Sequence, residues 1–356
     1  METRSLEFLK RLMDTISPSG YEDEAAKVWI EEAETFADEV TMDLHGNVIA
    51  VVNKGGSPRV MLAGHMDEIG FQVNYIDEKG FIWFTTIGGW DSQIAQGQRV
   101  WIRAKHGRVP GVIGKKPIHL LTPEDRNKVV TIDQCWIDIG VKDKKEAEKL
   151  VSIGDPVVIA HGFETMRNGY AVSRGFDDKA GAFVSLEAAR MLSKLKPKAE
   201  IHAVATVQEE IGLRGATTSA YGIDPKVGIA IDVEFATDFP TMEDPKKRIG
   251  DVKMSKGPVV VRGANISPKV FDLLVNTAKK KKIPHQVIGE ARGTGTDANA
   301  IQLNRAGVAT GLIGVPNRYM HSPCEVVSLD DLENSYKLLA YALAEITDKT
   351  DLTPFT

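Results

Sequence analysis

The chain alternates short apolar runs with longer stretches in which apolar residues recur every three or four positions. Four runs are rich in valine, isoleucine or alanine, too short for a typical helix and bounded by polar or turn residues: RVMLAG (59–64), IHAVATV (201–207), VGIAID (227–232) and VATGLIGV (308–315). Such runs are typical of buried strands in a parallel sheet. Helical patterns lie between and after them, at 179–195, 267–280, 296–306 and 329–348. This alternation predicts an α/β fold, with a mixed, largely parallel sheet sandwiched by helices.

The N-terminal part adds two helices and a hairpin to this plan. Residues 5–36 contain two helical patterns separated by the turn-forming stretch SPSG. The segments EVTMD and NVIAVV flank HGN, a pattern that predicts two strands joined by a tight turn.

The middle of the chain has a different pattern. Between about residues 72 and 168 helical periodicity almost disappears, and apolar and polar residues alternate in short runs separated by turn residues. We expect a small β-barrel domain, 72–168, inserted into a discontinuous catalytic α/β domain formed by 1–71 and 169–356. Only DKKEAEKLVS (143–152) looks helical within the insert.

The amino-acid composition limits which binding partners and which cellular location are expected for the protein. The 356 residues carry a formal net charge of -5, which argues against nucleic acid or an anionic membrane as the main partner. No apolar stretch approaches the length of a membrane span, and charges are scattered through the first ten residues, so we expect a cytoplasmic protein. Cys135 and Cys324 are far apart and form no disulfide framework; each is expected to be an ordinary reduced thiol.

Potential metal ligands follow or end all four predicted core strands. Because the carboxyl ends of parallel strands meet at one edge of the sheet, these side chains are expected to lie together. They are His65 and Asp67, Glu209 and Glu210, Asp232, and His321, with Asp177 and Asp178 at the start of a helix on the same edge.

Each of these residues also has a purely structural interpretation. Asp177 or Asp178 alone is a good helix N-cap, and His65 alone would fit as a hydrogen-bonded core histidine. His321 could be held by a backbone partner in a loop, and the glutamate pair could face solvent. Four separate coincidences on one sheet edge would be needed, so the combination favours a metal centre.

The types of ligand indicate which metals would bind and how. Two histidines with three or more carboxylates suit zinc or cobalt, with manganese also permitted. Five ligands with one bridging carboxylate are enough for two divalent ions per subunit. Adjacent Glu209 and Glu210 would then divide the roles of general base and ligand, provided the chain leaves extended structure near Gln208. Asp67 can hydrogen-bond the imidazole of His65 and fix its tautomer.

Five motifs in matching order resemble the M42 family of dinuclear aminopeptidases: GHMDEIGF (64–71), RGFDDKAGA (174–182), QEEIGLRGA (208–216), GTDA (295–298) and RYMHSPCE (318–325). The resemblance covers nearly the whole chain. It implies that one ion is held by His65, Asp177 and Asp232, and the other by Asp177, Glu210 and His321. It also implies that Asp177 bridges the ions, that Glu209 is the general base, that Asp67 supports His65, and that the Asp177–Asp178 peptide bond is cis.

The same resemblance implies the activity and the assembly. We expect a cytoplasmic aminopeptidase that removes N-terminal residues from short peptides and forms a homo-oligomer, a dodecamer built from dimers. The barrel domain would contribute to this assembly, and GKKPIHLL (114–121) matches a stretch usual in that insert. Alternatives are a related amidohydrolase or deacylase, a carboxypeptidase, an endoglucanase acting through paired carboxylates, and a non-catalytic peptide-binding scaffold.

Three points remain open at this level. Acidic, aliphatic and basic preferences for the N-terminal residue are all compatible with the resemblance. Thr296 and Asp297 either line the substrate pocket, or Thr296 only caps the following helix. Cys324, three residues after His321, is expected to be a small buried apolar residue.

Overall fold

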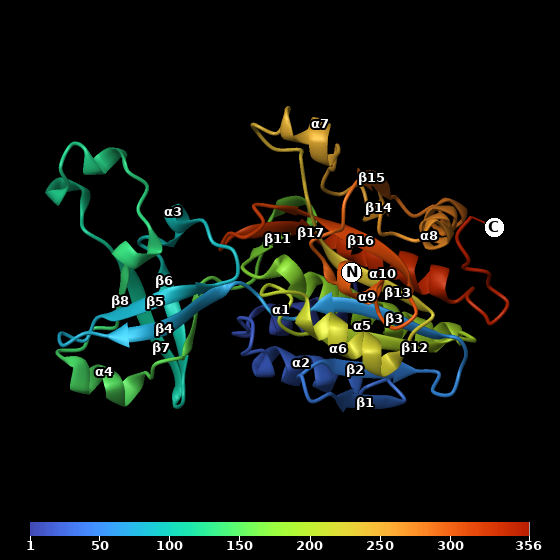
Figure 1. The fold of residues 1–356 in the computed structure, drawn as a ribbon, viewed down its shortest axis with the longest axis horizontal. Coiled ribbons are helices and arrows are strands. Elements are labelled where there is room, and N and C mark those ends of the chain that lie inside the picture. Colours follow the sequence, from blue (N-terminus) through green and yellow to red (C-terminus); the bar gives the residue numbers. More distant parts are fainter. Residues whose placement is uncertain (356) are drawn as a thin grey trace.

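The computed structural model describes residues 1–355 and contains two regions, an α/β region and a separate β-barrel (Figure 1). The α/β region is built on an eleven-stranded mixed sheet with the order β1-β2-β12-β3-β13-β16-β17-β11-β10, to which β14 and β15 are added beside β16. Its strands are β1 (Glu39–Met42), β2 (Val48–Val52), β3 (Arg59–His65), β10 (Glu164–Thr165), β11 (Tyr170–Ser173), β12 (Glu200–Thr206), β13 (Val227–Phe235), β14 (Val259–Gly263), β15 (Gln286–Glu290), β16 (Ala309–Arg318) and β17 (Glu325–Ser328).

The four apolar runs form the parallel centre of this sheet, in the order β12, β3, β13, β16. Strands β1 and β2 form the predicted antiparallel hairpin, and β2 pairs antiparallel with β12. The predicted mixed α/β fold is therefore confirmed. One boundary differs: β13 continues three residues past Asp232 to Phe235, so Asp232 lies inside the strand rather than at its end.

Helices cover both faces of the sheet because alternate strand residues point to opposite sides. On β3, Leu62 packs in the larger core with α1, α2, α5, α8 and α10, whereas Met61 packs on the other side with α6 and α9. The helices are α1 (Thr3–Met13), α2 (Asp23–Ala33), α5 (Phe176–Leu195), α6 (Arg214–Ile223), α7 (Pro245–Ile249), α8 (Pro268–Lys281), α9 (Asp297–Ile301) and α10 (Leu329–Leu343).

Helix α5 lies unusually close to β3. A Cβ atom on Gly64 would lie 2.2 Å from the carbonyl carbon of Gly181, so the strand and helix touch through glycine backbone. This contact places the first turn of α5 beside the carboxyl end of β3.

The predicted barrel is present as a closed six-stranded barrel with its own hydrophobic core (Figure 1). Its strands are β4 (Gly70–Ile76), β5 (Ile82–Ile87), β6 (Arg99–Ala104), β7 (Gly107–Gly114), β8 (Trp136–Asp138) and β9 (Pro156–Ile159). The expected helix is α4 (Lys144–Leu150), but it is not the only one, because α3 (Ser92–Ala95) and three short 3-10 segments also occur.

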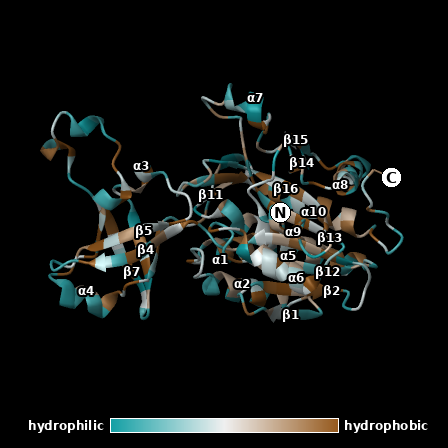
Figure 2. Ribbon diagram, in the orientation of Figure 1, coloured by the Kyte–Doolittle hydropathy of each residue, from teal (hydrophilic) through white to brown (hydrophobic). Residues whose placement is uncertain are grey.

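The exact limits of the insert stay a prediction. The barrel strands begin at Gly70, and Glu164–Thr165, inside the range expected for the insert, pairs with β11 of the large sheet. Hydrophobic residues concentrate in the strands of the large sheet, whereas the short peripheral helices α4 and α7 are mainly hydrophilic (Figure 2). Among the described residues, no helix has both the length and the apolar character needed to cross a bilayer.

Candidate metal centre

Six of the predicted site residues line one cavity at the carboxyl edge of the parallel strands. His65 ends β3, Glu209 and Glu210 lie in the turn after β12, and Asp232 lies near the end of β13. Asp177 comes from the first turn of α5, and His321 follows β16. Asp67 does not line the cavity and lies behind it.

The carboxylate of Asp177 lies between the two histidines. Its Oδ1 is 3.3 Å from Nε2 of His65, and its Oδ2 is 3.2 Å from Nε2 of His321. One carboxylate therefore presents a separate oxygen to each half of the centre, the arrangement needed for a bridging ligand.

The potential ligand atoms form two compact groups. His65, Glu209 and Asp232 make one group, and Asp177, Glu210 and His321 the other, with the atoms of each group within 4.8 Å of one another. The first group contains Glu209 where the family resemblance implied Asp177, although both carboxylates approach His65, Glu209 with its Oε2 at 3.7 Å.

Two observations indicate that this set of residues is suited to binding divalent cations. Four carboxylates converge on only two imidazoles, so the group carries an excess of negative charge unless cations are bound. In addition, Oε1 of Glu210 is buried and its nearest polar neighbour is Nε2 of His321, at a long 3.4 Å. Mixed imidazole and carboxylate donors suit zinc, cobalt or manganese.

The electrostatics of the protein alone show the same excess of negative charge. Burial raises the pKa of Glu209 to about 10, and the nearby charges of Asp232 and Asp297 add to the rise against the opposing effect of His65. Hydrogen bonds to Asp177 and Glu210 raise the pKa of His321 to about 11. Neighbouring carboxylates contribute to both pKa shifts, and a bound cation would oppose that contribution.

The backbone leaves extended structure at the predicted place. Strand β12 ends at Thr206, and Gln208 has a left-handed conformation with φ 55°. Asp67 then accepts hydrogen bonds from the next two backbone nitrogens, Oδ1 from Glu209 at 3.1 Å and Oδ2 from Glu210 at 3.2 Å. The turn thus lets both glutamate side chains reach the cavity, which a continuing strand would prevent.

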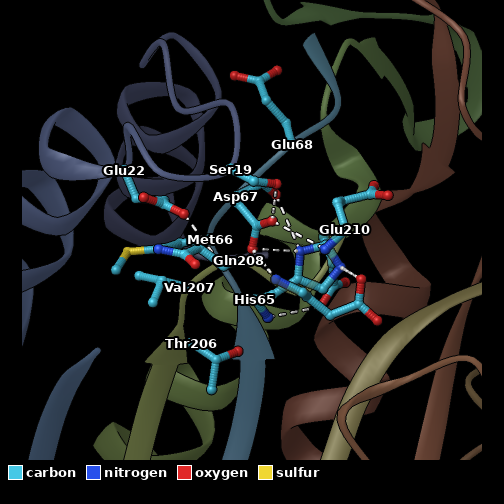
Figure 3. Close-up of polar contacts among 12 residues, drawn as sticks. Ser19, Glu22, His65, Met66, Asp67, Glu68, Thr206, Val207, Gln208 and Glu210 are labelled. Atoms are coloured by element: carbon cyan, nitrogen blue, oxygen red, sulfur yellow. Dashed lines mark hydrogen bonds and ion pairs between the residues drawn. The ribbon is translucent and has the colours of Figure 1, made fainter. Parts of the chain in front are cut away.

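Asp67 also lies against the ring of His65 (Figure 3). The Nδ1 atom of His65 lies 3.1 Å from the carbonyl oxygen of Asp67 and 3.3 Å from its Oδ1. Acceptors at Nδ1 place the proton there and leave Nε2 facing Asp177. Burial opposes ionisation of Asp67, but the nearby His65 and the hydroxyl of Ser19 lower its pKa.

The peptide bond between Asp177 and Asp178 is cis, as the family resemblance implied. The Asp178 carboxylate belongs to neither ligand group and accepts hydrogen bonds from the backbone nitrogens of His65, at 3.2 Å, and Gly181, at 2.9 Å. It therefore holds β3 and α5 together behind the centre.

The supporting contacts made by three residues were not predicted from the sequence. Glu325, buried, accepts hydrogen bonds from the backbone nitrogens of Asp177 and His321, both at 2.9 Å. The carbonyl oxygen of Gly89, in the loop after β5, lies 2.9 Å from Nδ1 of His321. Glu22, at the start of α2, accepts from the backbone nitrogen of Gln208 at 3.1 Å. Glu325 lies within the motif RYMHSPCE, so its acidic side chain was the one available signal.

Two expectations about neighbouring residues are settled. Cys324 is exposed, so the expectation of a small buried apolar residue was wrong; the turn after His321 directs the thiol outward, and Cys324 belongs to neither ligand group. Thr296 lines the cavity, and its side chain makes no capping hydrogen bond to the N-terminus of α9. Asp297 is buried beneath the cavity, where it accepts a hydrogen bond from the hydroxyl of Thr206 at 2.6 Å.

The cavity extends beyond the two ligand groups to a volume of about 860 Å³. Its further lining comes from β13 to β16 and the loops around them. These residues include Glu234, Val261, Ile288, Glu290, Leu312, Arg248 and Arg292.

Comparison with known proteins gives consistent matches. The family model described as M42 glutamyl aminopeptidase matches residues 46–338. A lysyl aminopeptidase from Pyrococcus furiosus is 39% identical over 351 residues, which are 98% of this chain and 99% of that protein.

Solved structures agree with this result. The TET aminopeptidase from the marine sediment archaeon Thaumarchaeota archaeon SCGC AB-539-E09 has a TM-score of 0.91 and 38% identity, covering 97% of each chain. The TET1 peptidase of Pyrococcus horikoshii, described as able to assemble into a tetrahedron or a large octahedral shell, has a TM-score of 0.85 and 32% identity, covering 96% of this chain and all of that chain.

Proposed function

The chain belongs to the M42 peptidase family and is a metal-dependent aminopeptidase. From that premise we propose a catalytic role for each residue of the centre. We propose that His65, Asp177 and Asp232 hold one divalent ion, and that Asp177, Glu210 and His321 hold the second. The position of Asp177 between the two histidines is the observation that carries this proposal. The donor set favours zinc or cobalt, with manganese as the next choice.

Divalent ions at this centre supply Lewis acidity that polarises the scissile carbonyl and makes a water molecule more acidic. Glu209, beside His65 in the cavity, acts as the general base. It takes a proton from the attacking water as the water oxygen bonds to the carbonyl carbon, and it delivers that proton to the leaving nitrogen as the C–N bond breaks.

The surrounding residues keep Glu209 in position for both proton transfers. Asp67 holds the backbone of Glu209 and Glu210, so the base and the neighbouring ligand keep a fixed spacing. The same carboxylate fixes the tautomer of His65. The substrates are short peptides with a free N-terminal amine, which the acidic cavity attracts.

Two isosteric variants test these roles. Glu209→Gln is expected to keep its metal content and to lose activity by about 10²- to 10⁴-fold, the usual contribution of a general base. Glu210→Gln, its matched neighbour, is expected to lose metal as well as activity, because it removes a ligand. Metal content is measured by elemental analysis and activity on aminoacyl-p-nitroanilides. Full activity in metal-loaded Glu209→Gln protein would rule out the assigned base.

The sequence-level alternatives make different predictions in the same assays. Glycoside hydrolysis needs two carboxyl groups and no metal, and therefore leaves His65 and His321 without a role. Deacylase or carboxypeptidase activity would share the metal centre but act on acylated amino acids or peptide C-termini. A substrate panel containing both kinds of compound separates these activities from removal of N-terminal residues.

We also propose that the chain assembles through its barrel into a homo-oligomer, a dodecamer built from dimers, in the cytoplasm. The support is the similarity to the TET1 peptidase and an exposed apolar group on the arm between β7 and β8. On that arm the exposed fractions are 57% for Ile118, 66% for Leu120 and 58% for Val129. Light scattering on the full chain measures the mass, and Leu120→Glu should shift it to smaller species.

A further inference from the structure

The family description and the name of the lysyl relative point to opposite charges on the N-terminal residue of the substrate. The structure of this chain offers its own answer in the part of the cavity beyond the ligands. Glu234 lies two residues after Asp232 on β13, so the two side chains leave the same face of the strand. Two residues of extended strand span roughly 7 Å, which places Glu234 within a side chain's length of the metal centre.

The surroundings of Glu234 leave space for its carboxylate beside the cavity. Glu234 pairs with Pro316 on β16, and its side chain also lies against Gly314, where a Cβ atom would be 2.6 Å from the Cβ of Glu234. The wall next to it is aliphatic, formed by Val261, Ile288 and Leu312 from β14, β15 and β16. The result is an apolar channel with a carboxylate in its lining.

Glu234 has no cationic partner among residues 1–355. It is half-buried, and the hydrogen bond that its Oε1 accepts comes from the adjacent backbone nitrogen of Phe235, at 3.0 Å. Among the described residues, no lysine, arginine or histidine forms an ion pair with it. Glu290, on β15, lines the same cavity and likewise makes no ion pair, since its Oε1 accepts only the backbone nitrogen of Arg292.

The two arginines that line the cavity are more exposed to solvent than the two glutamates. Arg248 on α7 and Arg292 after β15 are both exposed, so their charges are solvated and weakened. The carboxylates of Glu234 and Glu290 are the less exposed pair. An acidic substrate side chain in the channel would meet like charge beside an apolar wall, an arrangement that disfavours binding.

We propose that Glu234, assisted by Glu290, binds the side chain of a lysine or arginine at the N-terminus of the substrate. The methylene stem packs against Val261, Ile288 and Leu312, and the cationic end pairs with the two carboxylates. This inference rests on the aminopeptidase function, because it assumes that the α-amine and the scissile bond lie at the metal centre.

The test compares kcat/KM of the metal-loaded protein on lysyl-, arginyl-, leucyl- and glutamyl-p-nitroanilide. The wild-type protein is expected to prefer the two basic substrates over the leucyl and glutamyl ones by at least about 10-fold. Glu234→Gln should lower the lysyl-to-leucyl ratio of kcat/KM by about 10- to 100-fold, mainly through KM, since a charge-assisted contact is removed. Glu290→Gln should lower the ratio less.

Glu243→Gln is the matched control, because Glu243 is exposed, near α7 and outside the cavity lining. It should leave the ratio unchanged. A wild-type preference for the leucyl or glutamyl substrate would overturn the proposal, as would equal loss on all substrates in Glu234→Gln. Absence of cleavage of every substrate by metal-loaded wild-type protein would instead contradict the aminopeptidase function itself.

Discussion

Asp67 accepts a hydrogen bond from the backbone nitrogen of Glu209, at 3.1 Å between the nitrogen and Oδ1. The same carboxylate binds the next backbone nitrogen along the chain and lies beside the ring of His65. One buried side chain therefore sets the position of the proposed base and the orientation of a proposed metal ligand. The precision of the centre depends on backbone contacts of this kind as much as on the ligands themselves.

The hydroxyl of Ser19 supports Asp67, and its removal should reduce the rate without removing metal. Its Oγ donates to Oδ2 of Asp67 at 2.6 Å, and both residues are buried. Ser19→Ala leaves that oxygen with one donor fewer, so kcat should fall by roughly 10-fold while KM and metal content stay close to wild type.

Steady-state kinetics with elemental analysis checks this expectation. Ser152→Ala, at an exposed serine next to the barrel helix α4, is the control. If Ser19→Ala lost metal in proportion to activity, Ser19 would support the fold of the centre and not the position of the base.

Glu325 supports the other half of the centre, and Glu325→Gln should weaken metal binding. The carboxylate accepts from the backbone nitrogens of Asp177 and His321, and an amide can offer an oxygen to only one of them. The second N–H would then face an amide donor, so affinity for one ion should fall by about 10- to 100-fold.

Titration of metal-depleted protein with zinc, followed by calorimetry, measures the two sites separately. Asp330→Asn, exposed in the first turn of α10, is the matched control. Two unchanged binding steps in Glu325→Gln would contradict this role.

The sequence predicted the site better than it predicted what supports it. Strands with continuous apolar runs have a clear carboxyl end, so the pattern of residues alone was enough to assign His65, the glutamate pair and His321 to one edge of the sheet. The functions of Glu325 and Glu22 depend on which distant backbone N–H groups meet their oxygens, and no local pattern encodes that.

The predicted end of β13 and the predicted burial of Cys324 were both wrong, and both errors arise from tertiary structure. Strand β13 continues past Asp232 because β16 pairs with it as far as Asn317, and this pairing carries Glu234 into the cavity. Cys324 is exposed because the chain turns after His321, whose φ is 58°. Both features follow from tertiary pairing and from backbone turns rather than from the residue types.

Removal of metal should abolish activity and destabilise the protein. The carboxylates of Asp177, Glu209, Glu210 and Asp232 crowd one cavity, and without cations their repulsion is uncompensated. Chelation should lower activity at least about 100-fold and lower the thermal midpoint, because ligands that bind only the folded state stabilise it.

Differential scanning fluorimetry and activity assays before and after return of zinc, cobalt or manganese check both effects. Two ions per chain should restore activity. Full activity in the chelated protein would contradict the metal centre and favour hydrolysis by carboxylates alone.

Glu22 gives the protein a dependence of stability on pH. Burial and, to a lesser extent, the charge of Asp67 raise the pKa of Glu22 from 4.5 to about 7. A raised folded-state pKa means that the stabilising contribution is fully present below pH 4.5 and is lost as pH rises through about 7. The loss amounts to roughly 3 kcal/mol of unfolding free energy.

Glu22→Gln should therefore be more stable than wild type above pH 7, with the difference shrinking towards pH 4.5. The amide oxygen can still accept from the backbone nitrogens of Gly20 and Gln208, so the turn before Glu209 is retained while the buried charge is removed. Chemical denaturation at several pH values, with metal held constant, measures the difference. Glu31→Gln, an exposed change on α2, should show no such trend. A Glu22→Gln variant less stable than wild type at every pH would mean that the carboxylate is needed in its charged form.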